Sequence, residues 1–266
     1  MKVIKINLSD ELKGIQIHIF GDEHIGDEHS DIKRLKERID YVANTEDAYC
    51  VLNGDLIDNA TKTSIGDVYA NEFNPMKQLE TAVEIFEPIK NKILAITQGN
   101  HENRTYRKEG VDLTYLLAAQ LGLTDRYTPT SALLFVRLGK VSSNIKQTGH
   151  KDKTRQVLYT LYMLHGSNGG GRKEGAKAIR LADMASIVDT DCYIHNHTHL
   201  PMVMKQAFYR IDLRNNKVAS VEKLFVNGAS NLNYGGYGEA QEFKPSSKES
   251  PVIYLSGTKK EFNAKL

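Results

Sequence analysis

Histidine, aspartate, asparagine and glycine gather in five short clusters along the chain. The clusters are 21–24 (GDEH), 54–58 (GDLID), 99–102 (GNHE), 165–166 (HG) and 197–199 (HTH). A mixed set of nitrogen and oxygen ligands suits borderline divalent metals such as Mn, Fe or Zn. Two such ions, about 3.5–4 Å apart, need a bridging carboxylate, a shared water or hydroxide and further ligands on each side. The residue types therefore point to a dinuclear metal centre.

Each cluster directly follows a segment that reads as a β-strand. The sequence predicts these strands over 14–20, 48–53, 93–97, 156–164 and 192–194. Open α/β sheets bind their ligands at the carboxyl ends of strands, where the turns converge on one crevice. Glycine stands directly before Asp22, Asp55 and Asn100, and glycine permits the sharp backbone turn that aims the next side chain.

The rest of the chain supplies the elements that must hold these strands. Apolar residues recur at helical spacing over 32–42, 76–86, 113–121 and 181–188. Asn74-Pro75 is typical of a helix start. Further strands are expected over 132–138, 205–213, 217–226 and 251–255. The middle pair reads as a hairpin around Arg214-Asn215-Asn216.

The order of these elements bounds the architecture. Strands and helices alternate first and strands dominate later, which favours layered sheets covered by helices over a pure parallel sheet. No linker interrupts the pattern, so we expect a single domain over 1–266. Its motif-bearing part covers about 14–200 and its β-rich part 201–266. Two long loop-like segments, 139–155 and 229–250, are candidates for functional loops.

Composition limits the compartment. No apolar run reaches the length of a membrane span, and the N-terminus lacks the pattern of a secretory signal. Cys50 and Cys192 each lie in an apolar stretch, which predicts two buried, reduced thiols. We therefore expect a cytoplasmic protein without a membrane partner. The oligomeric state is left open.

In this order the five clusters resemble the calcineurin-like metallophosphoesterase superfamily, whose pattern is D-x-H, G-D-x-x-D, G-N-H-[D/E], H and G-H-x-H. The resemblance spans roughly residues 15–200. It implies an α/β fold of two mixed β-sheets packed face to face and flanked by helices, a four-layer αββα sandwich. It also implies a phosphoesterase that binds two divalent metal ions. Mn is the expected metal, and Fe, Zn and Ni are the alternatives.

The resemblance also assigns roles to motif positions. The implied metal ligands are Asp22, His24 and His199 for the first ion, Asp55 as the bridge, and Asn100, His165 and His197 for the second. His101 would be the catalytic histidine that contacts the phosphoryl group and assists the leaving group. One position departs from the pattern, since Asn196 stands where the family usually has glycine. Asparagine tolerates a positive φ next best, so we expect the turn to survive.

Other polar residues near the motifs receive simpler interpretations. We expect Glu23 to face solvent, His195 to pack under its turn, and Asp58 to hold the turn around Asp55. Residues 169–177 (GGGRKEGAK) resemble a phosphate-binding loop, but Ala176 stands where a Walker motif requires lysine.

The substrate is expected to be a phosphoester, and clusters of basic residues suggest DNA or RNA. Arg104, Arg172 and Lys173 are candidate substrate-binding residues, and basic residues also gather over 140–155. Solvated loop charge explains the same clusters almost as well. Three hypotheses stay open: a nucleic-acid phosphodiesterase, an enzyme for a small nucleotide or lipid-linked phosphate, and a non-catalytic binding module. The complete ligand set argues against the third.

Overall fold

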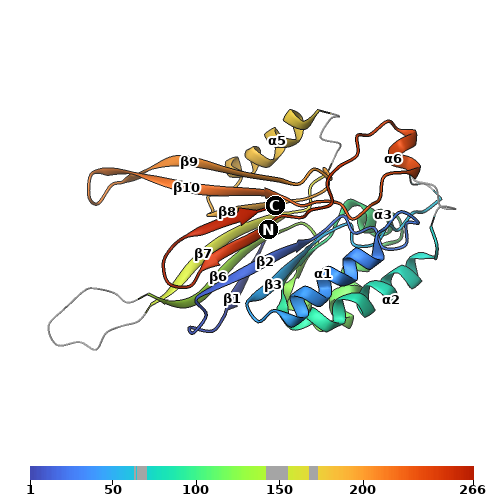
Figure 1. Cartoon of the computed structure of the whole chain (residues 1–266), viewed down its shortest axis with the longest axis horizontal. Helices are drawn as coiled ribbons and strands as arrows, with labels where there is room; N and C mark the ends of the chain where they lie inside the picture. The colour runs from blue at the N-terminus through green and yellow to red at the C-terminus, as the bar shows by residue number, and fades with distance from the viewer. Residues whose placement is uncertain (63, 65–70, 142–154, 168–172) are drawn as a thin grey trace.

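The computed structural model describes residues 1–62, 64, 71–141, 155–167 and 173–266. Two six-stranded sheets pack face to face, and helices cover the outer face of each (Figure 1). The layers follow the order helix, sheet, sheet, helix. This confirms the predicted four-layer αββα sandwich.

Sheet B has the strand order β12-β11-β2-β3-β4-β5. Its strands are β2 (Gly14–Phe20), β3 (Ala48–Asn53), β4 (Ile93–Thr97), β5 (Tyr127–Thr128), β11 (Val252–Ser256) and β12 (Phe262–Lys265). Strands β2 to β5 run parallel, whereas β11 runs antiparallel to both β2 and β12. The carboxyl ends of β2, β3 and β4 therefore lie together at one end of this sheet.

Sheet A has the strand order β1-β6-β7-β8-β10-β9. Its strands are β1 (Lys2–Asn7), β6 (Ser131–Val141), β7 (Arg155–Leu164), β8 (Cys192–His195), β9 (Met202–Asp212) and β10 (Lys217–Asn227). Strands β7, β8 and β10 run parallel, β6 is antiparallel to β7, and β9 is antiparallel to β10. The residues that follow β7 and β8 therefore emerge at the same end of sheet A.

The described helices are α1 (Ile32–Asn44), α2 (Pro75–Phe86), α3 (Asn100–Glu109), α4 (Leu113–Gln120), α5 (Glu174–Asp183) and α6 (Gly236–Ala240). Three 3-10 helices join them: η2 (Glu87–Lys92), η3 (Thr124–Arg126) and η4 (Met184–Ser186). The side chains of Asp31 and Asn74 accept the backbone N–H groups of Arg34 and Lys77, which caps α1 and α2. None of the helices in these described ranges combines the length and apolarity of a membrane span.

Three apolar cores separate the layers. Alternate residues of β2 (Ile15, Ile17 and Ile19) point into the core between the sheets, as a strand buried on one face requires. Helices α1, α2 and α4 cover sheet B, while α5 and η4 cover sheet A. Cys50 and Cys192 are buried free thiols, and burial raises the pKa of both.

Most predicted elements lie within a few residues of their expected bounds, but the sequence pattern does not predict β1, β5, β12 or α3, and α6 lies within the expected loop 229–250. The helix expected over 181–188 was misplaced, because α5 begins and ends earlier and continues as η4. Leu181 and Met184 are buried, and Val188 packs against the same cluster. The apolar spacing therefore reflects packing on sheet A and not one continuous helix. Most of 139–155 lies outside the described residues.

Candidate metal centre and active site

Asp22, His24 and His199 meet where the chain leaves β2 and β8. His199 Nε2 lies 3.3 Å from Asp22 Oδ1 and 3.4 Å from His24 Nε2. The ligand atoms of the three side chains lie within 4.8 Å of one another, so this group could hold one metal ion. Asp22 and His24 are buried, whereas the His199 side chain is 36% exposed.

Asp55, His165 and His197 form a second group of the same kind, which follows β3, β7 and β8. His165 Nε2 lies 3.1 Å from Asp55 Oδ2 and 3.2 Å from Asn100 Oδ1. On the other side of the ring, Nδ1 lies 2.7 Å from the main-chain oxygen of Asn53. Donation by Nδ1 to that oxygen fixes the ring and leaves Nε2 free to bind a cation.

The two groups are adjacent. His165 Nε2 of the second group lies 3.9 Å from Asp22 Oδ1 of the first, and Asn100 joins the second group from the first turn of α3. The structure thus brings all seven predicted ligands together: Asp22, His24, Asp55, Asn100, His165, His197 and His199. Side chains from both sheets meet at their shared end, as the strand order requires.

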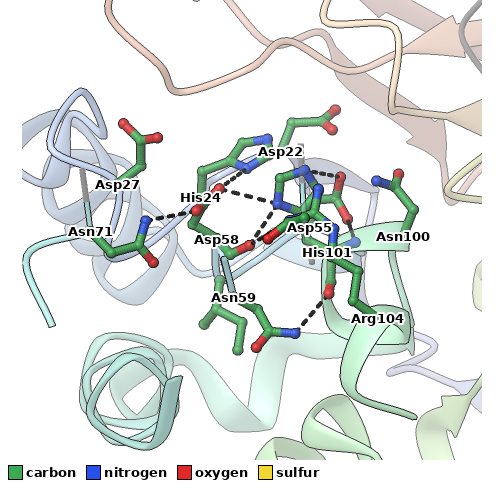
Figure 2. Close-up of polar contacts among 12 residues, drawn as sticks. Asp22, His24, Asp27, Asp55, Asp58, Asn59, Asn71, Asn100, His101 and Arg104 are labelled. Atoms are coloured by element: carbon green, nitrogen blue, oxygen red, sulfur yellow. Dashed lines mark hydrogen bonds and ion pairs between the residues drawn. The ribbon is translucent and has the colours of Figure 1, made fainter. Parts of the chain in front are cut away.

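His101 lies at the edge of this centre, held by Asp58 (Figure 2). Its Nδ1 lies 2.6 Å from the main-chain oxygen of Asp58 and 3.1 Å from the side-chain Oδ1. Asp58 Oδ1 also lies 3.4 Å from His24 Nδ1, and Asn71 donates to Asp58 Oδ2 at 2.8 Å. Asp58 therefore orients two imidazole rings and does more than support the turn.

Five of the seven predicted ligand residues, and not only the glycine before Asp55, adopt the left-handed conformation. Their φ angles are 55° at Asp22, 48° at His24, 50° at Asp55, 66° at His197 and 54° at His199. Non-glycine residues in this region cost of order 1–3 kcal/mol each and persist only where the surrounding structure holds them. The centre is therefore strained at its ligand positions, which sequence patterns cannot reveal.

The three glycines before the ligands have different functions. Gly54 has a φ of 76° and fits the predicted turn. Gly99 is needed for close approach, since a Cβ there would lie 2.1 Å from the backbone nitrogen of Asp55. A Cβ on Gly21 would likewise lie 2.6 Å from Asn196 Nδ2. Asn196 itself is not among the positive-φ residues, so the expected turn at that position was wrong and falls on His197 instead.

Glu102 is a buried carboxylate that holds the Asp55 turn in place. Its two oxygens accept the backbone N–H groups of Gly99, Asp55, Leu56 and Ile57 at 3.0, 3.1, 2.6 and 3.2 Å. One side chain thereby ties the start of α3 to the loop after β3. Sequence reasoning missed this function, although a glutamate three residues after a helix-start glycine is a capping signal.

Opposite charges stabilise each other inside the centre. Burial opposes ionisation of Asp22 and Asp55, but neighbouring histidines outweigh it and lower the pKa of both carboxyls. Burial also opposes protonation of His165, but Asp55 and Asp22 outweigh it and raise its pKa to about 10. For His197, burial and the charge of His165 lower the pKa to about 4. The carboxylates thus stay ionised and require nearby positive charge.

The residues fit divalent cations. Asp22 Oδ1 is buried and has no hydrogen-bond partner among the described residues, while its nearest polar neighbours are imidazole nitrogens. Leaving a buried carboxylate oxygen without a donor is costly. A cation between this oxygen and the imidazole nitrogens would remove that cost.

Two neighbouring residues test the simpler interpretations. Glu23 was predicted to face solvent, and this prediction was wrong, because its side chain is fully buried. Its Oε1 lies 2.9 Å from Arg38 Nη1, because a buried carboxylate needs a cationic partner. His195 packs under its turn as expected, with Nδ1 2.8 Å from Asn227 Oδ1.

Some of the basic residues lie beside loops of the metal centre, and others lie far from it. Arg104 Nη1 lies 3.4 Å from the main-chain oxygen of Asp58, and Lys177 Nζ lies 2.9 Å from that of Thr198. Lys173 is exposed at the start of α5, and Arg172 lies outside the described residues. Arg155 pairs with Val141 at the end of β7 opposite to His165. The flanks of 139–155 therefore do not lie beside the motifs.

A model of the calcineurin-like phosphoesterase family matches residues 16–218. The chain therefore belongs to the calcineurin-like phosphoesterase family, whose members use divalent metal ions, and the match supports phosphoric ester hydrolysis in general. A comparison with curated protein sequences finds no match.

Several solved structures are similar to the chain. One is a predicted phosphoesterase from Streptococcus pneumoniae, with 12% identity, a TM-score of 0.38 and coverage of 95% of this chain and 90% of that one. Vps29 from Chaetomium thermophilum has 12% identity and a TM-score of 0.40, covering 94% and 96%. Nuclease MPE from Pseudomonas putida has 12% identity and a TM-score of 0.35, covering 94% and 87%.

Proposed function

We propose that the chain is a phosphodiesterase that binds two divalent ions, preferably Mn²⁺, and hydrolyses nucleic-acid phosphodiester bonds. The observation that carries the proposal is the pair of adjacent ligand groups, Asp22–His24–His199 and Asp55–His165–His197. The alternative of a non-catalytic module leaves such a strained and buried arrangement unexplained.

When bound, two ions would acidify a water molecule and neutralise charge on the phosphoryl oxygens. The side chains of the centre would hold these ions in place. Asp55 Oδ2 lies 3.1 Å from His165 Nε2 and 3.8 Å from His101 Nε2, and Asp55 is the residue that would hold both ions. Asn100 presents a neutral oxygen to the second group.

His101 is the proposed general acid. Asp58 holds its Nδ1, so that a proton on Nε2 is available to a leaving-group oxygen. Burial disfavours the charged ring, but Asp55 and Asp58 outweigh burial and raise the pKa of His101. The side chain is 18% exposed, which leaves it accessible to substrate.

The substrate proposal rests on α3. This helix starts at the centre with Asn100 and carries Arg104, Arg107 and Lys108 along its length. Since an α-helix rises about 1.5 Å per residue, these charges lie within about 12 Å of Asn100 along the axis. A chain of phosphates could follow that row, whereas a small nucleotide would reach only Arg104.

The test compares Asp55→Ala with a matched surface control, Asp40→Ala on α1. The parent and the control should bind two Mn²⁺ per chain and cleave an aryl phosphodiester and single-stranded DNA. Asp55→Ala should lose most affinity for both ions and all measurable turnover. Elemental analysis showing full Mn²⁺ occupancy in Asp55→Ala would overturn the assignment. Cleavage of small phosphoesters but of no DNA or RNA would replace the nucleic-acid substrate by a small one.

A further inference from the structure

Asn196 lies buried between the ends of β2 and β8, directly under Asp22. Its Nδ2 donates to Asp22 Oδ2 at 3.1 Å. The backbone N–H of His197 donates to the same oxygen at 2.9 Å. Asp22 Oδ2 thus accepts two hydrogen bonds, while Oδ1 accepts none among the described residues. The two oxygens of this carboxylate are therefore not equivalent.

A chain of hydrogen bonds fixes the orientation of the Asn196 amide. Thr97 Oγ1 donates to Asn53 Oδ1 at 2.7 Å, and Asn53 Nδ2 donates to Asn196 Oδ1 at 2.8 Å. Because the Asn196 oxygen is engaged by Asn53, its nitrogen must face Asp22. The chain runs from the end of β4 through β3 to the residues after β8 and β2.

Gly21 and Gly228 lack side chains, and the space that this leaves is filled by the Asn196 amide. A Cβ on Gly21 would lie 2.6 Å from Asn196 Nδ2, and a Cβ on Gly228 would lie 2.4 Å from the same atom. In both cases the three nearest atoms belong to the Asn196 side chain. Glycine at position 196, which the family pattern usually has, could not fill this space or donate to Asp22.

We infer that Asn196 is a positioning residue that turns the Asp22 carboxylate so that Oδ1 faces the metal ions. Gly21 and Gly228 permit this by leaving room for the amide. The inference rests on the proposed function, because it concerns how one proposed metal ligand is held. Residues that orient metal ligands typically change metal affinity or activity about 10–100-fold when they are replaced.

The first test is Asn196→Ala, with Mn²⁺ binding to the metal-free protein measured by calorimetry. We expect affinity to fall about 10–100-fold, mainly in one of the two binding steps, since Asp22 is the predicted metal ligand whose side chain bonds Asn196. The matched control is Asn227→Ala. Asn227 is also buried, but it bonds His195 and the backbone oxygens of Leu200 and Gly228. This control should lower the unfolding temperature yet keep the parent's Mn²⁺ affinity.

The second test keeps Asn196 and changes the space that its amide fills. Gly21→Ala should displace the amide and weaken Mn²⁺ binding, whereas adding Gly21→Ala to Asn196→Ala should cause little further loss. Such non-additivity is expected of residues in direct contact. If Asn196→Ala does not fold, Mn²⁺ binding by Gly21→Ala alone tests the inference: weaker binding supports it and parent-like binding contradicts it.

Parent-like affinity in Asn196→Ala or Gly21→Ala would overturn the inference, as would an equal loss in Asn227→Ala. Failure of the parent to bind two Mn²⁺ would instead overturn the proposed function, so the two failures are distinguishable.

Discussion

His101 is the residue whose chemistry can be tested most directly. Its ring is fixed through Nδ1 by Asp58, while Nε2 faces the centre 3.8 Å from Asp55 Oδ2. A histidine that donates a proton to the leaving group contributes about 10²–10⁴-fold to the rate. His101→Ala should therefore keep both Mn²⁺ ions and lose rate in that range.

The loss in His101→Ala should depend on the leaving group. Poor leaving groups need the proton most, so a series of aryl phosphodiesters should give the largest loss at the highest phenol pKa. An equal loss across the series would show that His101 positions the substrate and donates no proton.

The sequence predicted which side chains gather, because each motif follows a strand whose end could be recognised. It did not predict how they are held. Glu23 was expected to face solvent, yet it is buried and Arg38 supplies its counter-charge from α1. The hydrogen bond between Asn53 and Asn196 was missed, since a contact between residues 143 positions apart leaves no local pattern.

At the scale of elements, α3 shows how a helix can form without apolar periodicity. Its sequence, NHENRTYRKE, offers almost no buried face. Instead, Glu102 accepts the backbone N–H of Gly99, Asp55 Oδ1 accepts that of His101, and Gly110 ends the helix with a φ of 69°. These end signals, Gly99 before the helix, Glu102 in its first turn and Gly110 after it, were the available evidence for the helix.

Glu102→Gln tests whether this carboxylate holds the Asp55 turn. An amide group in place of one oxygen would face buried N–H donors, so we expect the unfolding free energy to fall by about 2–4 kcal/mol. Mn²⁺ affinity should fall as well, because the loop that carries Asp55 loosens. Glu109→Gln, at the exposed end of the same helix, should change the unfolding free energy by less than about 0.5 kcal/mol. Equal small effects in urea titrations of both variants would contradict this function of Glu102.

At the scale of the whole molecule, helices α3 and α6 and the turn between β9 and β10 lie at opposite ends (Figure 1). The metal centre occupies the end with α3 and α6, while the turn of the β9–β10 hairpin lies at the other. Strand β10 pairs with β8 only over Leu224–Asn227, so the remaining hairpin extends past its neighbour and exposes Tyr209 and Leu213 at 82% and 83%. The sequence predicted both the hairpin and the short strand over 192–194, but it did not show that these two elements pair.

This separation of ends allows a sharp test of the nucleic-acid substrate. Arg107 and Lys108 lie at the exposed end of α3, whereas Arg214 and Lys217 lie at the hairpin turn. Changing either pair to glutamine removes the same charge. If DNA phosphates follow α3, only the Arg107 and Lys108 variant should bind DNA more weakly, and its affinity should depend less on salt. For duplex DNA, the slope of log affinity against log salt should become shallower by about 0.9 for each phosphate that the variant no longer neutralises.

Hydrolysis of a small aryl diester is the internal control for that comparison. Neither pair of substitutions should change it, since none of the four residues touches the metal ligands. Equal weakening of DNA binding by both pairs would mean that overall charge, and not a path along α3, attracts the polymer. Unchanged DNA cleavage and an unchanged salt slope in the Arg107 and Lys108 variant would show that these charges are only solvated surface. A phosphate chain would then have to leave the centre in another direction, and Lys177, whose Nζ lies 2.9 Å from the main-chain oxygen of Thr198, is the next basic residue to replace.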